Sequence, residues 1–391
     1  MDDLTPYRVA LTDWLACAYA GRGEPAARAA ADAGGEVADR VLHAATAGHV
    51  LDFDDTYLPG LSHLSAPTAP VAVVFGAQRR ATVAEVLRAY AAGFEAMAAV
   101  AAASHPQLYD GGWHPTAVCG TVGAAVTAAT LLGLDPPTCA QACNLAVLGA
   151  GGFRAAFGSD GKSLQVGLAA VTGLHAAKLA AAGTQVPDRT RRGTWSFESV
   201  FGATWADPDL ASPAIADNWL KRYPCCLQTH GAIEAAVAAR ERGVAASGTG
   251  TVTVHPISCD AAPLGPDVET GLEAKFSISY CTALGIVRGH PTRADFAEVD
   301  AATRALAARI DVRTDDSLRE SEAHLRWQGT DGRVIETMTD AAVGSPDHPM
   351  DDRQLQAKLA DLSAEHLPGL LVDPDADAAA LAELLATARP G

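Results

Sequence analysis

The sequence predicts a mainly α-helical protein: a large all-helical domain with a smaller α+β domain inserted into it. Alanine, the best helix former, is the commonest of the 391 residues, apolar residues make up 49% of the chain, and aromatic residues only 6%. Strand-like patterns are few and occur only between residues 249 and 338. We therefore expect the helical domain over residues 1–247 and 348–391, and the smaller domain over residues 248–347.

The helices of the larger domain follow from apolar spacing and from glycine or proline breaks. Residues 5–21 place Trp14, Leu15 and Ala18 near one face, and Gly21 and Gly23 end the pattern. The same reasoning predicts helices at 25–33, 37–51, 66–76, 82–105, 117–132, 136–151 and 163–182.

The character of the chain changes near Gly248. Residues 249–254 alternate Thr and Val, which is typical of a strand, and shorter strands are expected at 309–313 and 333–338. Helices are expected at 270–289, 353–364 and 375–388. Strands this sparse do not favour a doubly wound parallel sheet.

Charge and cysteine content limit the partners and cofactors. The net charge of −17 argues against nucleic acid, whose phosphates need clustered Lys and Arg, but it allows a locally positive site for an anion. The eight cysteines form no CxxC and show neither zinc nor iron–sulfur spacing, so we expect no metal site. Scattered thiols suggest a reducing, cytoplasmic compartment. We also expect no signal peptide and no membrane span.

The segment 49–67 concentrates the chain's most reactive side chains. It holds three aspartates, Asp52, Asp54 and Asp55, followed by Thr56 and His63, and a Pro59-Gly60 break makes it a loop. Crowded carboxylates raise one another's pKa, so a fold tolerates them best where something uses or neutralises them. The alternative is a solvated loop in which Asp52 or Asp55 caps the next element.

Further downstream, three polar residues stand out by their position. His114 precedes Pro115 at a helix start, where backbone N–H groups favour an anion, and Lys162 enters a helix after two glycines. Lys221 lies beside the Cys225-Cys226 pair, for which buried packing is favoured over a nucleophile. His114 and Lys162 each have a purely structural alternative: His114 could cap a helix, and Lys162 could be a solvated lysine. Tyr280 could simply pack in the core.

These segments, in this order, resemble the MmgE/PrpD family, which includes 2-methylcitrate dehydratases, cis-aconitate decarboxylases and iminodisuccinate epimerases. The resemblance is carried by LDFDDT at 51–56, GWHPT at 112–116, Lys162, KRYPCC at 221–226 with the following TH, and EAKFS with Tyr280. Four positions depart from the family pattern: Leu64, Gly111, Ser163 and Gln165. The region before Asp52 is also shorter than is usual in the family.

The resemblance implies a homodimeric, cofactor-free enzyme whose smaller domain is a lid. Its expected catalytic residues are Asp52, His63, His114, Lys162 and Tyr280, and its expected substrate-binding residues are Thr56 and Lys221. Family reactions depend on a proton beside a carboxylate, so a proton carrier near neutral pKa is needed. We expect His63 in that role, with Asp52 orienting it or favouring its protonated form.

Three reactions remain open. We favour a lyase, a dehydratase or decarboxylase, acting on a small polycarboxylate such as 2-methylcitrate or cis-aconitate. An epimerase or isomerase of a small dicarboxylate such as iminodisuccinate is the runner-up, and a non-catalytic binding protein on the same fold is a further alternative. The choice depends on which substrate bond lies over the charge-stabilising groups, and residue spacing does not show this.

Overall fold

The computed structural model describes residues 3–32 and 37–386, and the chain separates into two compact units. We call the first the helical unit; it comprises the residues up to Val50, Asp54–Leu220 and the residues from Leu362 onward. We call the second the sheet unit; it comprises Leu51–Phe53 and Lys221–Asp361. Each unit is described by itself.

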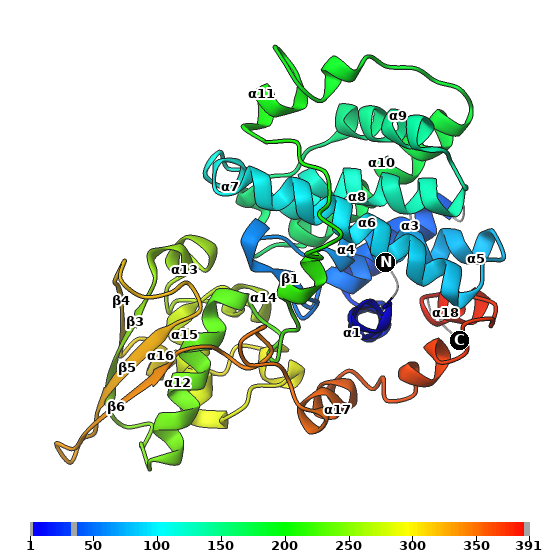
Figure 1. The fold of residues 1–391 in the computed structure, drawn as a ribbon. Coiled ribbons are helices and arrows are strands. Elements are labelled where there is room, and N and C mark those ends of the chain that lie inside the picture. Colours follow the sequence, from blue (N-terminus) through cyan, green and yellow to red (C-terminus); the bar gives the residue numbers. More distant parts are fainter. Residues whose placement is uncertain (1–2, 33–36, 387–391) are drawn as a thin grey trace. The chain divides into compact units, whose positions relative to one another are not determined.

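The helical unit is built on three long helices, α6, α8 and α10 (Figure 1). Helix α8 packs against both α6 and α10, and α10 also packs against α3 and α9. The helices of this unit are α1 (Thr5–Gly21), α2 (Pro25–Asp32), α3 (Val37–His49), α4 (Ser65–Pro70), α5 (Gly76–Gln78), α6 (Val83–Ser104), α7 (Gln107–Asp110), α8 (Pro115–Leu131), α9 (Pro136–Ala146), α10 (Asp160–Ala181), α11 (Phe197–Phe201) and α18 (Ala379–Leu384).

Small residues let these helices approach closely. A Cβ on Gly93 of α6 would lie 1.9 Å from Thr127 Oγ1 of α8, and a Cβ on Gly173 of α10 would lie 2.6 Å from Ala125 N. Most of α8 is buried because it is covered from several sides. The alanine-rich composition therefore produces a core of tightly packed helix backbones.

One expected helix has a different form. Residues 66–76 were expected as a single helix, but α4 passes through a π-helical turn at Val71–Phe75 before α5 begins. Pro70 lacks an N–H and cannot continue the regular helical hydrogen bonding, which accounts for a change of helix type at this point. For the helices expected over 25–33 and 375–388, the predicted last residue lies outside the described part of the chain.

Two helices of this unit are long and apolar enough to cross a membrane by length and composition. They are α6, whose most apolar window is 72% buried, and α10, whose window is 50% buried. Buried core helices have the same properties, and α6 and α10 both pack against α8. The expectation that the chain has no membrane span stays a prediction.

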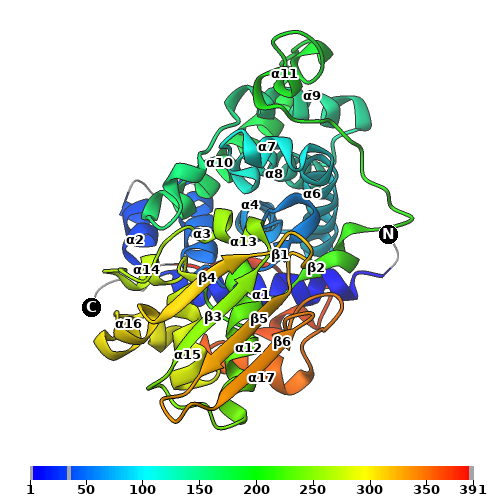
Figure 2. The ribbon, with the colours of Figure 1, turned by 90° about the vertical axis from the view of Figure 1, so that its left-hand side faces the viewer.

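The sheet unit contains a four-stranded mixed sheet in the order β4-β3-β5-β6 (Figure 2). β3 pairs with β4 in parallel and with β5 antiparallel, and β5 pairs with β6 antiparallel. Helix α12 packs against β5 and β6. The elements are β3 (Thr249–Val254), β4 (Ile310–Thr314), β5 (Ala323–Gln328), β6 (Val334–Thr339), α12 (His230–Glu241), α13 (Pro256–Ala261), α14 (Gly271–Ala274), α15 (Ile278–Arg288), α16 (Ala301–Ala307) and α17 (Asp352–Asp361).

A mainly helical protein with a small mixed sheet is confirmed, and β3 begins and ends where its Thr/Val alternation predicted. Strand β5 was not predicted, although Ala323, Leu325 and Trp327 alternate along it and are all buried. The helix expected at 270–289 is two helices, because Ser277 caps the start of α15. The domain limits 248 and 347 stay a prediction; the sheet unit is wider because it includes α12 and α17.

Candidate active site

From Asp54 onward, the loop after α3 belongs to the helical unit and is held there by short backbone pairings. Strand β1 (Thr56–Tyr57) pairs antiparallel with β2 (Asn218–Trp219), and Tyr57 bridges to Ser62. The backbone N–H of His63 then donates to Thr116 Oγ1 at 3.1 Å, which ties the loop to the first turn of α8. These pairings fix where the His63 imidazole leaves the backbone.

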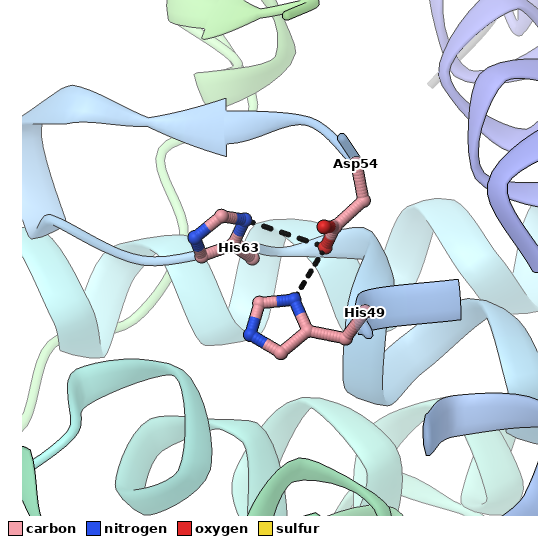
Figure 3. Close-up of side chains that lie close together, drawn as sticks. All are labelled: His49, Asp54 and His63. Carbon is pink, nitrogen blue, oxygen red and sulfur yellow. Dashed lines mark hydrogen bonds and ion pairs between the residues drawn. The ribbon is translucent and has the colours of Figure 1, made fainter. Parts of the chain in front are cut away.

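Asp54 lies between two imidazoles (Figure 3). Its Oδ2 is 2.8 Å from His49 Nδ1 and 3.3 Å from His63 Nδ1. The two rings are 4.5 Å apart and meet edge to face. Because an ionised carboxylate only accepts hydrogen bonds, both Nδ1 atoms act as donors, and the Nε2 atoms are left to face other groups. We call His49, Asp54 and His63 the imidazole–carboxylate cluster.

The charge of Asp54 is stabilised by its two neighbours. Burial by itself raises the pKa of this carboxyl, but the imidazoles of His49 and His63 outweigh burial and hold the pKa well below its usual range. The carboxylate is fully buried, so the negative charge acts on the imidazoles with little screening from water. The cluster can therefore hold a proton on a histidine and transfer it.

The same three residues offer ligand atoms for a metal ion, all within 4.8 Å of one another. Ligand atoms about 2.0–2.1 Å from a tetrahedral zinc lie roughly 3.3 Å apart. The separation of 2.8 Å between His49 Nδ1 and Asp54 Oδ2 is shorter and matches an N–H···O hydrogen bond. The donor set suits a transition metal, but the geometry fits proton sharing better.

His114 lies against this cluster. It occupies the N-cap position of α8, and its ring stacks on His49 with centroids 6.1 Å apart. Gln165 Nε2 donates to His114 Nδ1 at 2.6 Å, while Gln165 Oε1 accepts the backbone N–H of Phe153 at 2.8 Å. The glutamine that departs from the family pattern thus orients the His114 ring.

Lys162 reaches the same area from the first turn of α10. Its ammonium lies 5.5 Å from the centroid of the Phe157 ring, and that ring meets His114 edge to face at 5.0 Å. The side chain is buried, with only 7% exposure, so the alternative of a solvated lysine does not describe Lys162. Thr56 Oγ1 lies 3.5 Å from His63 Nδ1, at the limit of a hydrogen bond. The helical unit therefore groups Thr56, His63, His114 and Lys162.

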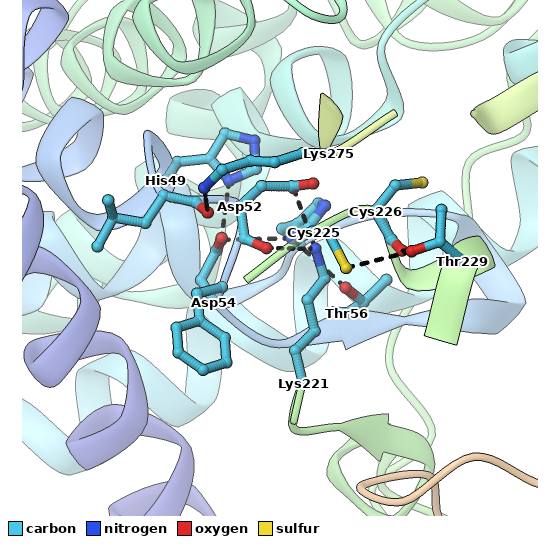
Figure 4. A network of polar contacts seen from close by, with 12 residues as sticks. His49, Asp52, Asp54, Thr56, Lys221, Cys225, Cys226, Thr229 and Lys275 are labelled. Carbon is cyan, nitrogen blue, oxygen red and sulfur yellow. Dashed lines mark hydrogen bonds and ion pairs between the residues drawn. The ribbon is translucent and has the colours of Figure 1, made fainter. Parts of the chain in front are cut away.

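The other expected site residues lie in the sheet unit. Lys221 Nζ donates to Asp52 Oδ1 at 3.0 Å and to the Asp52 carbonyl at 3.1 Å, and both side chains are buried (Figure 4). Tyr280 is fully buried, and its hydroxyl accepts the backbone N–H of Asp300 at 3.1 Å. Burial raises the pKa of Tyr280, so its O–H keeps its proton and is available as a donor.

The cysteine pair is internal to the sheet unit. Cys225 Sγ lies 3.1 Å from Thr229 Oγ1, and Cys226 is also buried. Figure 4 draws the contact between Cys225 and Thr229. Burial by itself raises the pKa of Cys225, but hydrogen bonding from Cys281 and the nearby His230 outweigh burial and hold the pKa below its usual range. Both thiols are buried, which agrees with the packing role expected for the pair.

Two residues of the imidazole–carboxylate cluster, His49 and Asp54, were not among the expected site residues. Both lie in the segment that we singled out, but spacing does not show which of three aspartates faces an imidazole. The available signal was the last histidine of α3 followed five residues later by an aspartate. In the helical unit Asp54 contacts His63, and in the sheet unit Asp52 pairs with Lys221.

Comparison with known proteins agrees with these motifs. The family model of the MmgE/PrpD N-terminal domain matches residues 4–207, and that of the MmgE/PrpD C-terminal domain matches residues 223–379. Cis-aconitate decarboxylase from Homo sapiens is 32% identical over 216 residues, which cover 50% of this chain and 43% of the human protein. Cis-aconitate decarboxylase from Mus musculus is 30% identical over 212 residues, covering 49% and 42%.

Each of these relatives is thus matched over less than half of its own length. The two family models, in contrast, follow one another along nearly the whole chain, and the N-terminal model alone covers more than half of it. The chain belongs to the MmgE/PrpD family.

Proposed function

We propose that this protein is a cofactor-independent lyase that acts on a small polycarboxylate such as cis-aconitate or 2-methylcitrate. The observation that carries the proposal is the buried carboxylate of Asp54 between the imidazoles of His49 and His63. Family membership and two relatives named cis-aconitate decarboxylase support lyase chemistry.

His63 is the proposed proton carrier. Asp54 orients its ring through Nδ1 and favours the imidazolium, so the Nε2–H is the acidic proton offered to the substrate. In a decarboxylation, the bond between carbon and the leaving carboxylate breaks and carbon dioxide departs. The electron pair stays on carbon, which then takes the proton from His63. In a dehydration, a base removes the carbon-bound proton and the hydroxyl leaves as water after it is protonated.

The remaining predicted residues bind and orient the anion. In the helical unit, the Lys162 ammonium and the His114 ring both lie against the Phe157 ring. A substrate carboxylate bound beside them would find a cation and a hydrogen-bond donor. Thr56 supplies a hydroxyl beside His63. Asp52, Lys221 and Tyr280, which lie in the sheet unit, are proposed as further residues of the reaction, as the family resemblance implies.

The proposal extends to the surroundings of the enzyme. We propose a cytoplasmic homodimer that needs no metal and binds neither nucleic acid nor membrane. The acidic composition supports the expectation that the protein does not bind nucleic acid, and the scattered cysteines support a reducing compartment. The homodimer is what the family resemblance implies.

A mass-spectrometric screen in deuterated water tests the reaction. The purified protein is incubated with cis-aconitate, 2-methylcitrate, citrate and iminodisuccinate, with the His63→Ala variant as the control for contaminating activity. Loss of carbon dioxide with one deuterium gained identifies a decarboxylase, and loss of water identifies a dehydratase. Deuterium uptake without fragment loss identifies an epimerase and contradicts the lyase. No change in any compound, together with tight binding of one, indicates the binding protein.

A further inference from the structure

Lysine is rare in this chain and mostly internal. The sequence contains five lysines, at positions 162, 178, 221, 275 and 358, against 24 arginines. Four of the five are buried, with exposed fractions of 7% for Lys162, 0% for Lys221, 6% for Lys275 and 3% for Lys358. Lysine is almost never fully buried unless it is paired, so each of these side chains needs a partner inside the protein.

Three of the buried lysines converge on three consecutive residues. Within the sheet unit, Lys275 Nζ donates to the carbonyl of Leu51, and Lys221 Nζ donates to the carbonyl and to Oδ1 of Asp52. Lys358 Nζ donates to the carbonyl of Phe53 at 2.8 Å. We call Lys221, Lys275 and Lys358 the lysine clamp. They come from three separate parts of the chain: the residues after β2, the end of α14 and helix α17.

The clamp is supported by packing as well as by hydrogen bonds. The Lys358 ammonium lies 4.3 Å from the centroid of the Phe53 ring, whose carbonyl it also binds. The Lys275 ammonium lies 5.8 Å from the centroid of the Phe296 ring. Cation–π contacts of this kind stabilise a desolvated ammonium. These ring contacts hold the ammonium groups of Lys275 and Lys358 beside the carbonyls that they bind.

The backbone that the clamp holds is in an unfavourable conformation. Asp52 has a φ of 52°, in the left-handed region that residues other than glycine rarely adopt. None of Leu51, Asp52 and Phe53 belongs to a helix or strand. Cationic donors on three successive carbonyls give this segment external hydrogen bonds in place of regular secondary structure. A compact ammonium suits such single-carbonyl contacts better than the planar fork of arginine.

We propose that Lys275 and Lys358 are positioning residues: they hold the backbone on either side of Asp52 so that its carboxylate is kept on Lys221. The inference rests on the proposed function in one respect, namely that Asp52 takes part in the reaction. Lys275 and Lys358 donate to the carbonyls of the residues that flank Asp52, so we expect their effect on turnover to pass through the placement of Asp52.

Two variants and a matched control test the clamp without relying on activity. Lys275→Met and Lys358→Met remove the ammonium and keep much of the side-chain volume, while Lys178→Met changes an exposed lysine on α10. Hydrogen exchange followed by mass spectrometry is measured on peptides that cover residues 49–56. Exchange there should speed up by about 10-fold or more in both clamp variants and not in the control. Unchanged exchange in the clamp variants would overturn the proposal.

Steady-state kinetics test the effect on the reaction. Lys358→Met should lower kcat by about 100-fold, as expected for a displaced site residue, and change KM by less than about 3-fold. In an Asp52→Asn background the same substitution should add little further loss. A further 100-fold loss of kcat in the Asp52→Asn background would mean that Lys358 does not act through Asp52, and would overturn the proposed positioning role.

If the methionine variants do not fold, a variant that keeps the positive charge tests the clamp in their place. Lys358→Arg retains a cationic donor but not its compact shape, so it should lose about 3–30-fold in kcat and show intermediate exchange. Exchange and turnover like those of the unmodified protein would contradict the geometric argument. If the unmodified protein turns over none of the polycarboxylates, the proposed function fails, and the exchange experiment alone decides whether the clamp holds residues 51–53.

Discussion

Asp54→Asn is the substitution that most directly tests the imidazole–carboxylate cluster. The amide nearly reproduces the shape of the carboxylate but removes the negative charge that lies 2.8 Å from His49 Nδ1 and 3.3 Å from His63 Nδ1. All three side chains are buried, so water cannot replace the lost charge. The change therefore separates the effect of charge from that of packing.

The expected loss of stability follows from the two contacts. A hydrogen bond to a charged group contributes about 1.5–3 kcal/mol, so the pair contributes roughly 3–6 kcal/mol. The amide oxygen still accepts one neutral hydrogen bond worth about 1 kcal/mol, and its NH₂ group faces an imidazole N–H unfavourably. We expect unfolding in urea at pH 7 to show a net loss of at least about 2–5 kcal/mol.

The pH dependence has a definite sign. The pKa of Asp54 is depressed in the folded protein, so its contribution is present above the unfolded value of about 3.9 and is lost as pH falls through the folded pKa. The difference in stability between the unmodified protein and Asp54→Asn should therefore be full at pH 7 and shrink in acid.

Asp54→Asn should also lower turnover, independently of its effect on stability. Without the carboxylate, the imidazolium of His63 is less favoured and the ring is free to choose the other tautomer, so kcat should fall by about 100-fold or more. The alkaline limb of the pH–rate profile should also move to lower pH. Asp135→Asn, which changes an exposed aspartate at the N-cap of α9 to another good cap, is the matched control. A profile and kcat equal to those of the control would refute the role assigned to Asp54.

Three further predictions follow from other contacts. His63→Ala should lower kcat by about 100-fold or more with the helical unit still folded, checked by circular dichroism; turnover like that of the unmodified protein would remove His63 from the mechanism. Asp55 is fully buried, and burial, with the charge of Asp54, raises its pKa to about 7. The folded protein thus holds a proton that the unfolded chain releases near pH 3.9, and stability falls as pH rises through this window, by about 4 kcal/mol at most. Asp55→Asn should remove that slope in urea unfolding at pH 5 and pH 8, and an unchanged slope would contradict it. Gly93→Ala would place a Cβ 1.9 Å from Thr127 Oγ1, so it should cost about 1–3 kcal/mol and lower Tm, whereas an unaltered Tm would show that α6 and α8 can separate.

Local sequence patterns were sufficient for much of the fold. Helix α1 spans Thr5–Gly21 as its apolar spacing and following glycines predicted, and β3 spans the predicted Thr/Val alternation. Both signals arise from a single element with one buried face, so neighbouring residues contain the information. Strand β5 has the same alternation, with buried Ala323, Leu325 and Trp327 on one face, but it was not predicted.

The sequence by itself determined the family, the mainly helical class and the segments in which reactive side chains occur, because these depend on composition and on residues close together in the chain. Only the tertiary structure decided the partner of each aspartate between residues 52 and 55. Asp52 turns to Lys221 through a left-handed φ, Asp54 joins two imidazoles, and Asp55 is buried beside Ser65. Those choices depend on loop dihedrals and on residues up to about three hundred positions away, as the Lys358 contact with Phe53 illustrates, and no local pattern encodes such distances.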